Sequence, residues 1–151
     1  MAIAWKYIDK PAATIAAVCD YENMQSVIDI TPPEIKAVRE RMTAPRSAKV
    51  TGMPKQKNPR GNEDAIVDAI DRLDVLRERY DQALEYMAWF EPAWGALADE
   101  ERVILREFYM SGNQRSGATA RLQAKLSYCD RQIERMRHKA LNRLSTLLFG
   151  K

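Results

Sequence analysis

The chain of 151 residues is long enough to bury one substantial hydrophobic core or two small ones, and its composition is typical of a globular protein. No apolar run approaches the roughly 18 residues of a membrane-spanning helix, and the first ten residues lack the pattern of a signal peptide, so we expect a cytoplasmic protein without a membrane partner. Cys19, Cys129 and the single histidine, His138, form no metal-binding spacing, so we expect neither a metal ion nor another cofactor.

The formal net charge of +3 conceals a strong segregation of charge along the chain. Residues 36–60 carry eight basic and one acidic side chain, and residues 115–151 carry nine basic and two acidic ones. Between these blocks, residues 61–96 carry three basic and nine acidic side chains. Two basic blocks around an acidic segment favour a protein that binds nucleic acid and uses the acidic segment structurally.

The first 43 residues are predicted to be helical in separate pieces. Residues 1–30 read as an N-terminal helical extension without recognisable chemistry. A new helix is expected to begin at Thr31, which can cap it, with Pro32 in the first helical position and Glu34 completing a capping box. This helix should end near Thr43, shortly before the next proline.

Residues 43–62 are predicted to form a linker, because three prolines and two glycines interrupt any regular element. The linker is basic, with cations at Arg46, Lys49, Lys55, Lys57 and Arg60. Its charge is consistent with a solvated connector or with an arm that lies along a phosphate backbone, and the sequence leaves both open.

A long helix is predicted from residue 63 to about residue 90, because apolar residues recur there with a heptad period. Pro92 is expected to end this helix. One seam holds Ile66, Leu73, Tyr80, Met87 and Trp94, and the second holds Ala69, Leu76, Ala83 and Phe90. The partner is either the helix of residues 31–42 folded back, or the same helix in a second copy, which would give a homodimer through residues 63–90. Residues 31–96 therefore form a helical hairpin or coiled coil.

Residues 97–151 are predicted to form three helices, with a turn at residues 127–129 before the last helix, residues 130–148. Helix, loop, helix, tight turn and helix is the plan of a helix-turn-helix domain. The predicted fold is therefore all-α: a long heptad helix paired with a short N-terminal helix, followed by a C-terminal tri-helical DNA-binding domain.

The last helix has a buried stripe and an opposite polar face that suits the major groove of DNA. The stripe consists of Ile133, Met136, Ala140, Leu141 and Leu144. Base contacts are expected near the helix start, from Arg131, Gln132 and Arg135. Phosphate contacts are expected from Arg121, Lys125, His138, Lys139, Asn142 and Arg143.

Arg137 lies at the edge of the apolar stripe and is expected to have a structural role instead. We predict an ion pair with Glu100 or Glu101 of the helix expected over residues 97–110, which would hold the module together. An enzyme is not expected, because no nucleophile has a general base nearby and no glycine-rich phosphate-binding motif is present.

The spacing of apolar residues in 97–144 resembles the promoter-binding region 4 of bacterial sigma factors of the sigma-70 class. The residues that carry this resemblance are Leu97, Glu101, Ile104, Leu105, Phe108, Tyr109, Leu122, Leu126, Ile133, Met136, Ala140, Leu141 and Leu144. The sequence departs from that pattern in a longer loop, SGNQRSG, and in Gln123, where a small residue is usual. No region that reads a −10 promoter element precedes it, so the chain is not a complete sigma factor.

From Glu34 to Lys151 the chain is similar to late-gene transcriptional regulators of the ArpU and RinA type, which phages and prophages encode. The run GMPKQKNPRGNEDAI and the final LSYCDRQIERMRHKALNRLSTLLFGK carry the similarity. The resemblance implies a regulator that binds double-stranded DNA in a host bacterial cell and acts near the host RNA polymerase. A small subunit of a phage terminase and a polymerase-binding module that never contacts DNA are the alternatives.

Overall fold

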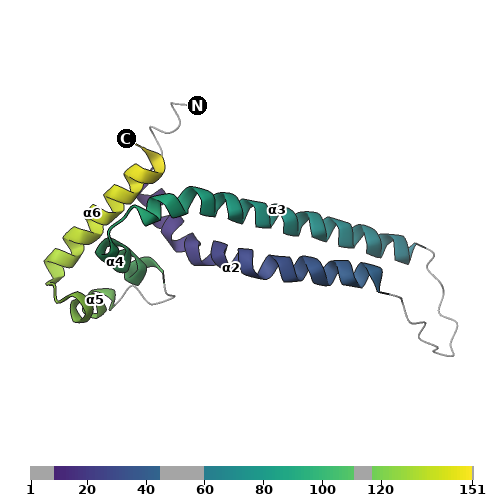
Figure 1. The fold of residues 1–151 in the computed structure, drawn as a ribbon, viewed down its shortest axis with the longest axis horizontal. Coiled ribbons are helices and arrows are strands. Elements are labelled where there is room, and N and C mark those ends of the chain that lie inside the picture. The colour runs from purple at the N-terminus through teal and green to yellow at the C-terminus, as the bar shows by residue number, and fades with distance from the viewer. Residues whose placement is uncertain (1–8, 45–59, 111–116, 151) are drawn as a thin grey trace. The chain divides into compact units, whose positions relative to one another are not determined.

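The computed structural model describes residues 9–44, 60–110 and 117–150 of the chain. Within these ranges all regular structure is helical, which confirms the predicted all-α class. The helices are α2 (Lys10–Thr43), α3 (Gly61–Gly95), α4 (Asp99–Tyr109), α5 (Ala118–Leu126) and α6 (Asp130–Phe149) (Figure 1). None of these described helices combines the length and the apolar character that crossing a bilayer requires.

The chain divides into two compact units, and each is described by itself. The terminal unit comprises Met1–Gln25 and Glu85–Lys151, and the hairpin unit comprises Ser26–Leu84. This division differs from the predicted one, which treated residues 1–30 as an extension and began the C-terminal domain at residue 97. The start of α2 and the end of α3 belong to the terminal unit because their apolar side chains complete its core.

In the hairpin unit, α2 and α3 pair along one narrow apolar seam. Val38 of α2 is buried with Leu73 and Leu76 of α3, and Ile35 and Ala69 pack at the margin. The helix around residues 31–42 and the heptad helix therefore pair within one chain, as one of the two predicted arrangements requires.

The helix start predicted at Thr31 is wrong, because α2 continues through Pro32 and Pro33. The Thr31 side chain is fully buried and its hydroxyl donates a hydrogen bond to the carbonyl of Val27, 2.6 Å away and one turn earlier. It therefore acts inside a helix and does not cap one. Burial of this face overrides the local preference of the Thr-Pro-Pro-Glu sequence for a helix start.

The end predicted at Pro92 is also wrong, because α3 runs on to Gly95. Phe90, Ala93 and Trp94 are buried on both sides of the proline, in the core of the terminal unit. Phe90 stacks on Tyr86 and Trp94, with ring centroids 5.4 and 5.7 Å apart. These contacts hold the last turn of α3 although Pro92 donates no backbone hydrogen bond.

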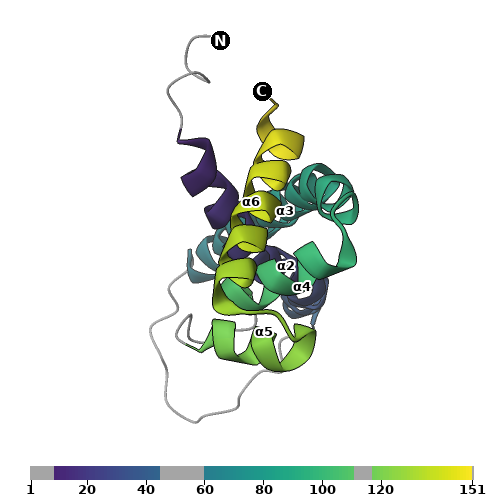
Figure 2. The same ribbon diagram turned by 90° about the vertical axis from the view of Figure 1, so that its left-hand side faces the viewer.

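Two clusters of buried side chains form the core of the terminal unit. The larger one consists of Ala17, Val18, Phe90, Ala93, Trp94, Leu97, Leu105, Met110, Ala140, Leu141, Leu144 and Leu148. The smaller one consists of Ile104, Phe108, Ala118, Leu122 and Ile133. Helices α4, α5 and α6 all pack on one another, and Figure 2 shows α6 running upward from its start beside α5, across α4, to the C-terminus. The apolar stripe of α6 thus joins both clusters, and the opposite side of the helix faces outward.

Candidate nucleic-acid interface

Helix α6 begins at a sharp turn that the backbone conformation explains. α5 ends at Leu126, and its C-cap residue, Ser127, has a φ of 58° in the left-handed region. The chain is then extended at Cys129, with φ −77° and ψ 160°. The Cys129 carbonyl accepts the amide protons of Gln132 and Ile133, each at 3.0 Å. Three residues thus separate two helices, and the fully buried Ile133 fixes the side of α6 that faces the core.

One face of α6 carries exposed polar side chains that make no hydrogen bond or ion pair with any other described residue. These side chains are Arg131, Gln132, Arg135, His138, Lys139 and Asn142. The sequence predicted all six as DNA contacts, and the structure brings them together on one exposed helix face. A cation without an internal partner can bind an external anion without breaking an existing ion pair.

Arg121 and Lys125, predicted as phosphate contacts, have a role inside the terminal unit. Both bind the carboxylate of Glu107 on α4, Arg121 through Nε at 3.0 Å and Lys125 through Nζ. The Glu107 side chain is only 11% exposed. The hydrogen bonds from Lys125, and next those from Arg121, hold the pKa of Glu107 below its ordinary value of 4.5 against the opposing effect of burial. The pair therefore ties α5 to α4.

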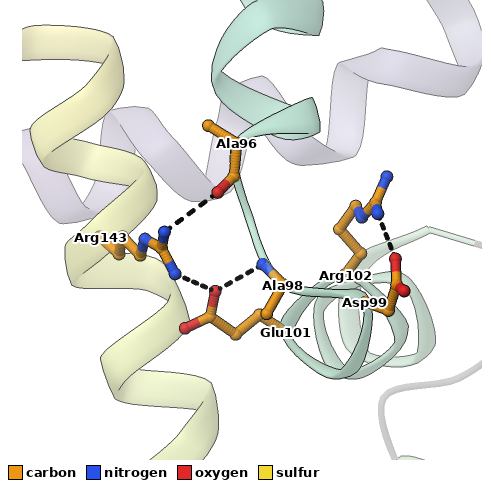
Figure 3. A network of polar contacts seen from close by, with 6 residues as sticks. All are labelled: Ala96, Ala98, Asp99, Glu101, Arg102 and Arg143. Atoms are coloured by element: carbon orange, nitrogen blue, oxygen red, sulfur yellow. Dashed lines mark hydrogen bonds and ion pairs between the residues drawn. The ribbon is translucent and has the colours of Figure 1, made fainter.

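Arg143 links α6 to the turn between α3 and α4, as Figure 3 shows. Its Nη1 donates to Oε2 of Glu101 at 3.1 Å, and its Nη2 donates to the carbonyl of Ala96, also at 3.1 Å. The same Glu101 oxygen accepts the amide proton of Ala98 at 3.0 Å. The guanidinium thus uses both terminal nitrogens within the fold, although the sequence predicted a phosphate contact.

The ion pair predicted between Arg137 and Glu100 or Glu101 is wrong. Arg137 binds Glu134 of its own helix at 2.6 Å, donates to the Tyr109 hydroxyl at 3.2 Å and lies 4.9 Å above the centre of the Phe108 ring. Arg143 takes Glu101 in its place, six residues or about 9 Å further along α6. The prediction placed the contact on the correct helix but at the wrong position along the helix axis.

Two further residues at this site had no predicted role. Gln123 of α5 donates a hydrogen bond to the Asp130 carboxylate in the first turn of α6, and so bridges the turn between the two helices. Glu107 lies three residues after Ile104, on the edge of the apolar face of α4. A carboxylate in that position signals a buried ion pair, because an unpaired charge there would be costly. That signal was present in the sequence.

No family model matches the sequence, and comparisons with curated proteins and with solved structures find no match either. Within the described residues, no three His, Cys, Asp or Glu side chains gather where they could hold a metal ion. Proposals about function therefore depend on the geometry of the terminal unit and on the residues of α6.

Proposed function

We propose that the chain is a sequence-specific DNA-binding transcription regulator in which α5, the turn at residues 127–129 and α6 act as a helix-turn-helix. The observation that carries the proposal is that, within the described ranges, some cations of the terminal unit bind internal partners and others do not. Arg121, Arg137 and Arg143 bind internal partners, whereas Arg131, Arg135 and the polar residues beside them have none among the described residues. An exposed face of unpaired donors on one helix suits insertion into the major groove.

The first turns of α6 would read bases. Arg131 and Arg135 can each bridge O6 and N7 of guanine, and Gln132 can bridge N6 and N7 of adenine. His138, Lys139 and Asn142 lie further along the same face and would contact phosphates. The phosphate contacts predicted for Arg121, Lys125 and Arg143 would have to compete with their ion pairs, so these three are weaker candidates.

The wider proposal includes the origin and partners of the protein. The resemblance of residues 97–144 to a promoter-binding region supports a regulator that works beside the host RNA polymerase. The resemblance of residues 34–151 to late-gene regulators of the ArpU and RinA type supports a phage or prophage origin. A homodimer through α3 would cover Ile66, Val67 and Ile70, which are 47%, 54% and 45% exposed. A dimer would also present two copies of α6 to a symmetric DNA site.

Selection from a pool of random DNA duplexes tests the reading role of α6. The wild-type protein should enrich a defined sequence, and Arg131→Ala with Arg135→Ala should abolish the enrichment. Each bidentate contact contributes about 1–3 kcal/mol of discrimination, so the double variant should lose on the order of 30-fold to 10⁴-fold in specificity. Arg72→Ala with Arg79→Ala is the matched control, because it removes the same charge from exposed positions of α3.

Loss of enrichment in both double variants would point to net charge and not to reading by α6. Enrichment that survives in the α6 variant would contradict the proposal. Binding to purified RNA polymerase without any salt-dependent binding to DNA would favour a polymerase-binding module instead.

A second comparison, between Lys139→Ala and Arg143→Ala, distinguishes a cation that contacts DNA phosphate from one that stabilises the fold. Lys139→Ala should lower the slope of log affinity against log salt by about 0.9, the effect of one phosphate contact, and leave stability unchanged. Arg143→Ala should reduce the free energy of unfolding by about 1 kcal/mol, because it removes two hydrogen bonds at the α3–α4 turn. Anisotropy titrations and urea unfolding measure the two effects, and the reverse pattern would contradict the assignment.

A further inference from the structure

A second group of cations lines a groove between α2 and α3 within the hairpin unit. The groove encloses about 370 Å³, and its lining residues are Pro32, Ile35, Lys36, Arg39, Arg77 and Tyr80. No acidic side chain lines it, although residues 61–84 contain seven acidic residues and only three basic ones. The positive charge of this groove is therefore a local property that the composition of α3 does not predict.

The cations of the groove are available to an external anion. Lys36 lies 3.9 Å from Glu40 and Arg77 lies 3.7 Å from Asp74, and all four side chains are more than half exposed. Exposed pairs at such distances contribute little, so an incoming anion replaces them at small cost. The Arg39 side chain is exposed and pairs with no described residue.

The chemistry of the lining distinguishes between the polyanions that could bind. Its charged groups are all hydrogen-bond donors, and the Tyr80 hydroxyl is the one side-chain acceptor among the six lining residues. The sugar–phosphate backbone of DNA presents acceptors and no donors, whereas an acidic peptide also brings N–H groups that need acceptors. Pro32, Ile35 and the Tyr80 ring add apolar surface that suits deoxyribose, and guanidinium groups bind phosphate through two parallel hydrogen bonds.

We infer that this groove binds the sugar–phosphate backbone of duplex DNA without regard to sequence. All residues that line the groove belong to the hairpin unit and none belongs to α6, so the inference can be tested independently of base reading by α6. Its cations bind phosphates one by one, and the neighbouring apolar surface packs against the sugars. Binding here adds affinity and salt dependence without adding specificity.

The experiment uses the full chain with Arg131→Ala and Arg135→Ala, which removes the proposed readers, and a duplex of mixed sequence as the probe. Anisotropy titrations over a range of salt concentrations give the slope of log affinity against log salt. Combining Lys36→Gln, Arg39→Gln and Arg77→Gln should lower this slope by up to about 2.7, or about 0.9 for each lost contact. The same three substitutions in the otherwise wild-type chain should leave the sequence selected from a random pool unchanged.

The matched control removes three cations from the same two helices outside the groove. It combines Arg41→Gln, Arg72→Gln and Arg79→Gln, and should lower the slope by less than about 0.9. An equal loss in both triple variants would show an effect of net charge alone and overturn the inference. An unchanged slope in the groove variant, with unchanged helical circular dichroism, would overturn it as well.

Two further measurements test the chemistry of the groove. Arg39→Lys with Arg77→Lys keeps the charge, and should keep the salt slope while weakening DNA binding about threefold to tenfold, because lysine cannot form the parallel pair of bonds. Unchanged affinity in this variant would contradict bidentate phosphate binding. Polyglutamate should compete poorly for the groove; displacement of DNA by polyglutamate at equal charge concentration would assign the groove to acidic proteins instead.

Discussion

The terminal unit and the hairpin unit are built from the same element, the α-helix, but they bury very different amounts of side chain. Among the described residues, the terminal unit has core clusters of twelve and five buried side chains, whereas the hairpin unit has one cluster of three. Helix α3 contributes to both units with one uninterrupted heptad pattern. The same pattern therefore yields a deep core where several helices converge and a narrow seam where only one partner is present.

The contrast extends to polar side chains. In the terminal unit, Glu101 and Glu107 are buried; Glu101 binds Arg143 of α6, and Glu107 binds two cations of α5. In the hairpin unit, the ion pairs of Lys36 and Arg77 are exposed and stay within one helix. A unit that fixes its cations internally can present a rigid helix face, whereas a unit with loosely paired cations can offer them to a polyanion.

The largest effect is expected when a buried leucine is replaced by alanine, and the same substitution can be compared in the cores of the terminal unit and the hairpin unit. Leu144→Ala should reduce the free energy of unfolding by about 3–5 kcal/mol, because Leu144 is fully buried in the largest cluster and leaves a cavity. Leu73→Ala should cost about 2 kcal/mol or less, because its small cluster lies close to solvent and can collapse or admit water.

Urea unfolding with two probes can resolve the units. Trp89 and Trp94 both lie in the terminal unit and no tryptophan lies in residues 26–84, so tryptophan fluorescence follows the terminal unit while circular dichroism follows all helices. Leu73→Ala should shift the circular dichroism transition more than the fluorescence transition. Equal costs for the two substitutions would mean that the hairpin unit is packed as tightly as the terminal unit.

An intermediate effect is expected at the buried carboxylate that joins α4 to α5. Glu107→Gln should reduce the free energy of unfolding by about 1–3 kcal/mol at neutral pH, because it removes the charge that binds Lys125 and Arg121. Its lowered pKa means that the carboxylate stabilises the fold above the ordinary value of 4.5, and that this stability is lost as the pH falls through the lowered pKa.

The difference in free energy of unfolding between wild type and Glu107→Gln should therefore be constant near neutral pH and become smaller below about pH 4.5. Thermal or urea unfolding at a series of pH values measures it. Glu91→Gln, at an exposed position of α3 in the same unit, is the control and should show little change at any pH. A difference that widens in acid would contradict the assigned ion pairs.

The smallest effect is expected at an exposed pair in the hairpin unit. Glu40→Gln should change the free energy of unfolding by at most about 0.5 kcal/mol, because Lys36 and Glu40 are 79% and 68% exposed. Added salt should remove even this effect. A cost as large as that of Glu107→Gln would show that exposure is a poor guide to the value of ion pairs in this protein.

Much of the candidate interface follows from periodicity within one helix. The apolar spacing of Ile133, Ala140 and Leu144 fixes which side of α6 is buried, and this spacing alone places Arg131 and Arg135 on the exposed side. Contacts between helices do not follow in the same way. Glu101 binds Arg143 and not Arg137 because of the position at which α6 packs along α4. The periodicity within one helix does not specify that position.

The sequence by itself determined the all-α class, the heptad seam of α3 from Leu73 onward and the exposed face of α6, because each follows from the apolar repeat within a helix. Ile66, the first residue of the predicted seam, is 47% exposed. Only the tertiary structure decided that α2 continues through Pro32 and that α3 continues past Pro92, since burial of Thr31 and of Phe90 and Trp94 outweighs the prolines beside them. It likewise decided which cations are bound internally and which face outward. Both outcomes depend on neighbours that are distant in sequence, and local preferences are too weak to specify them.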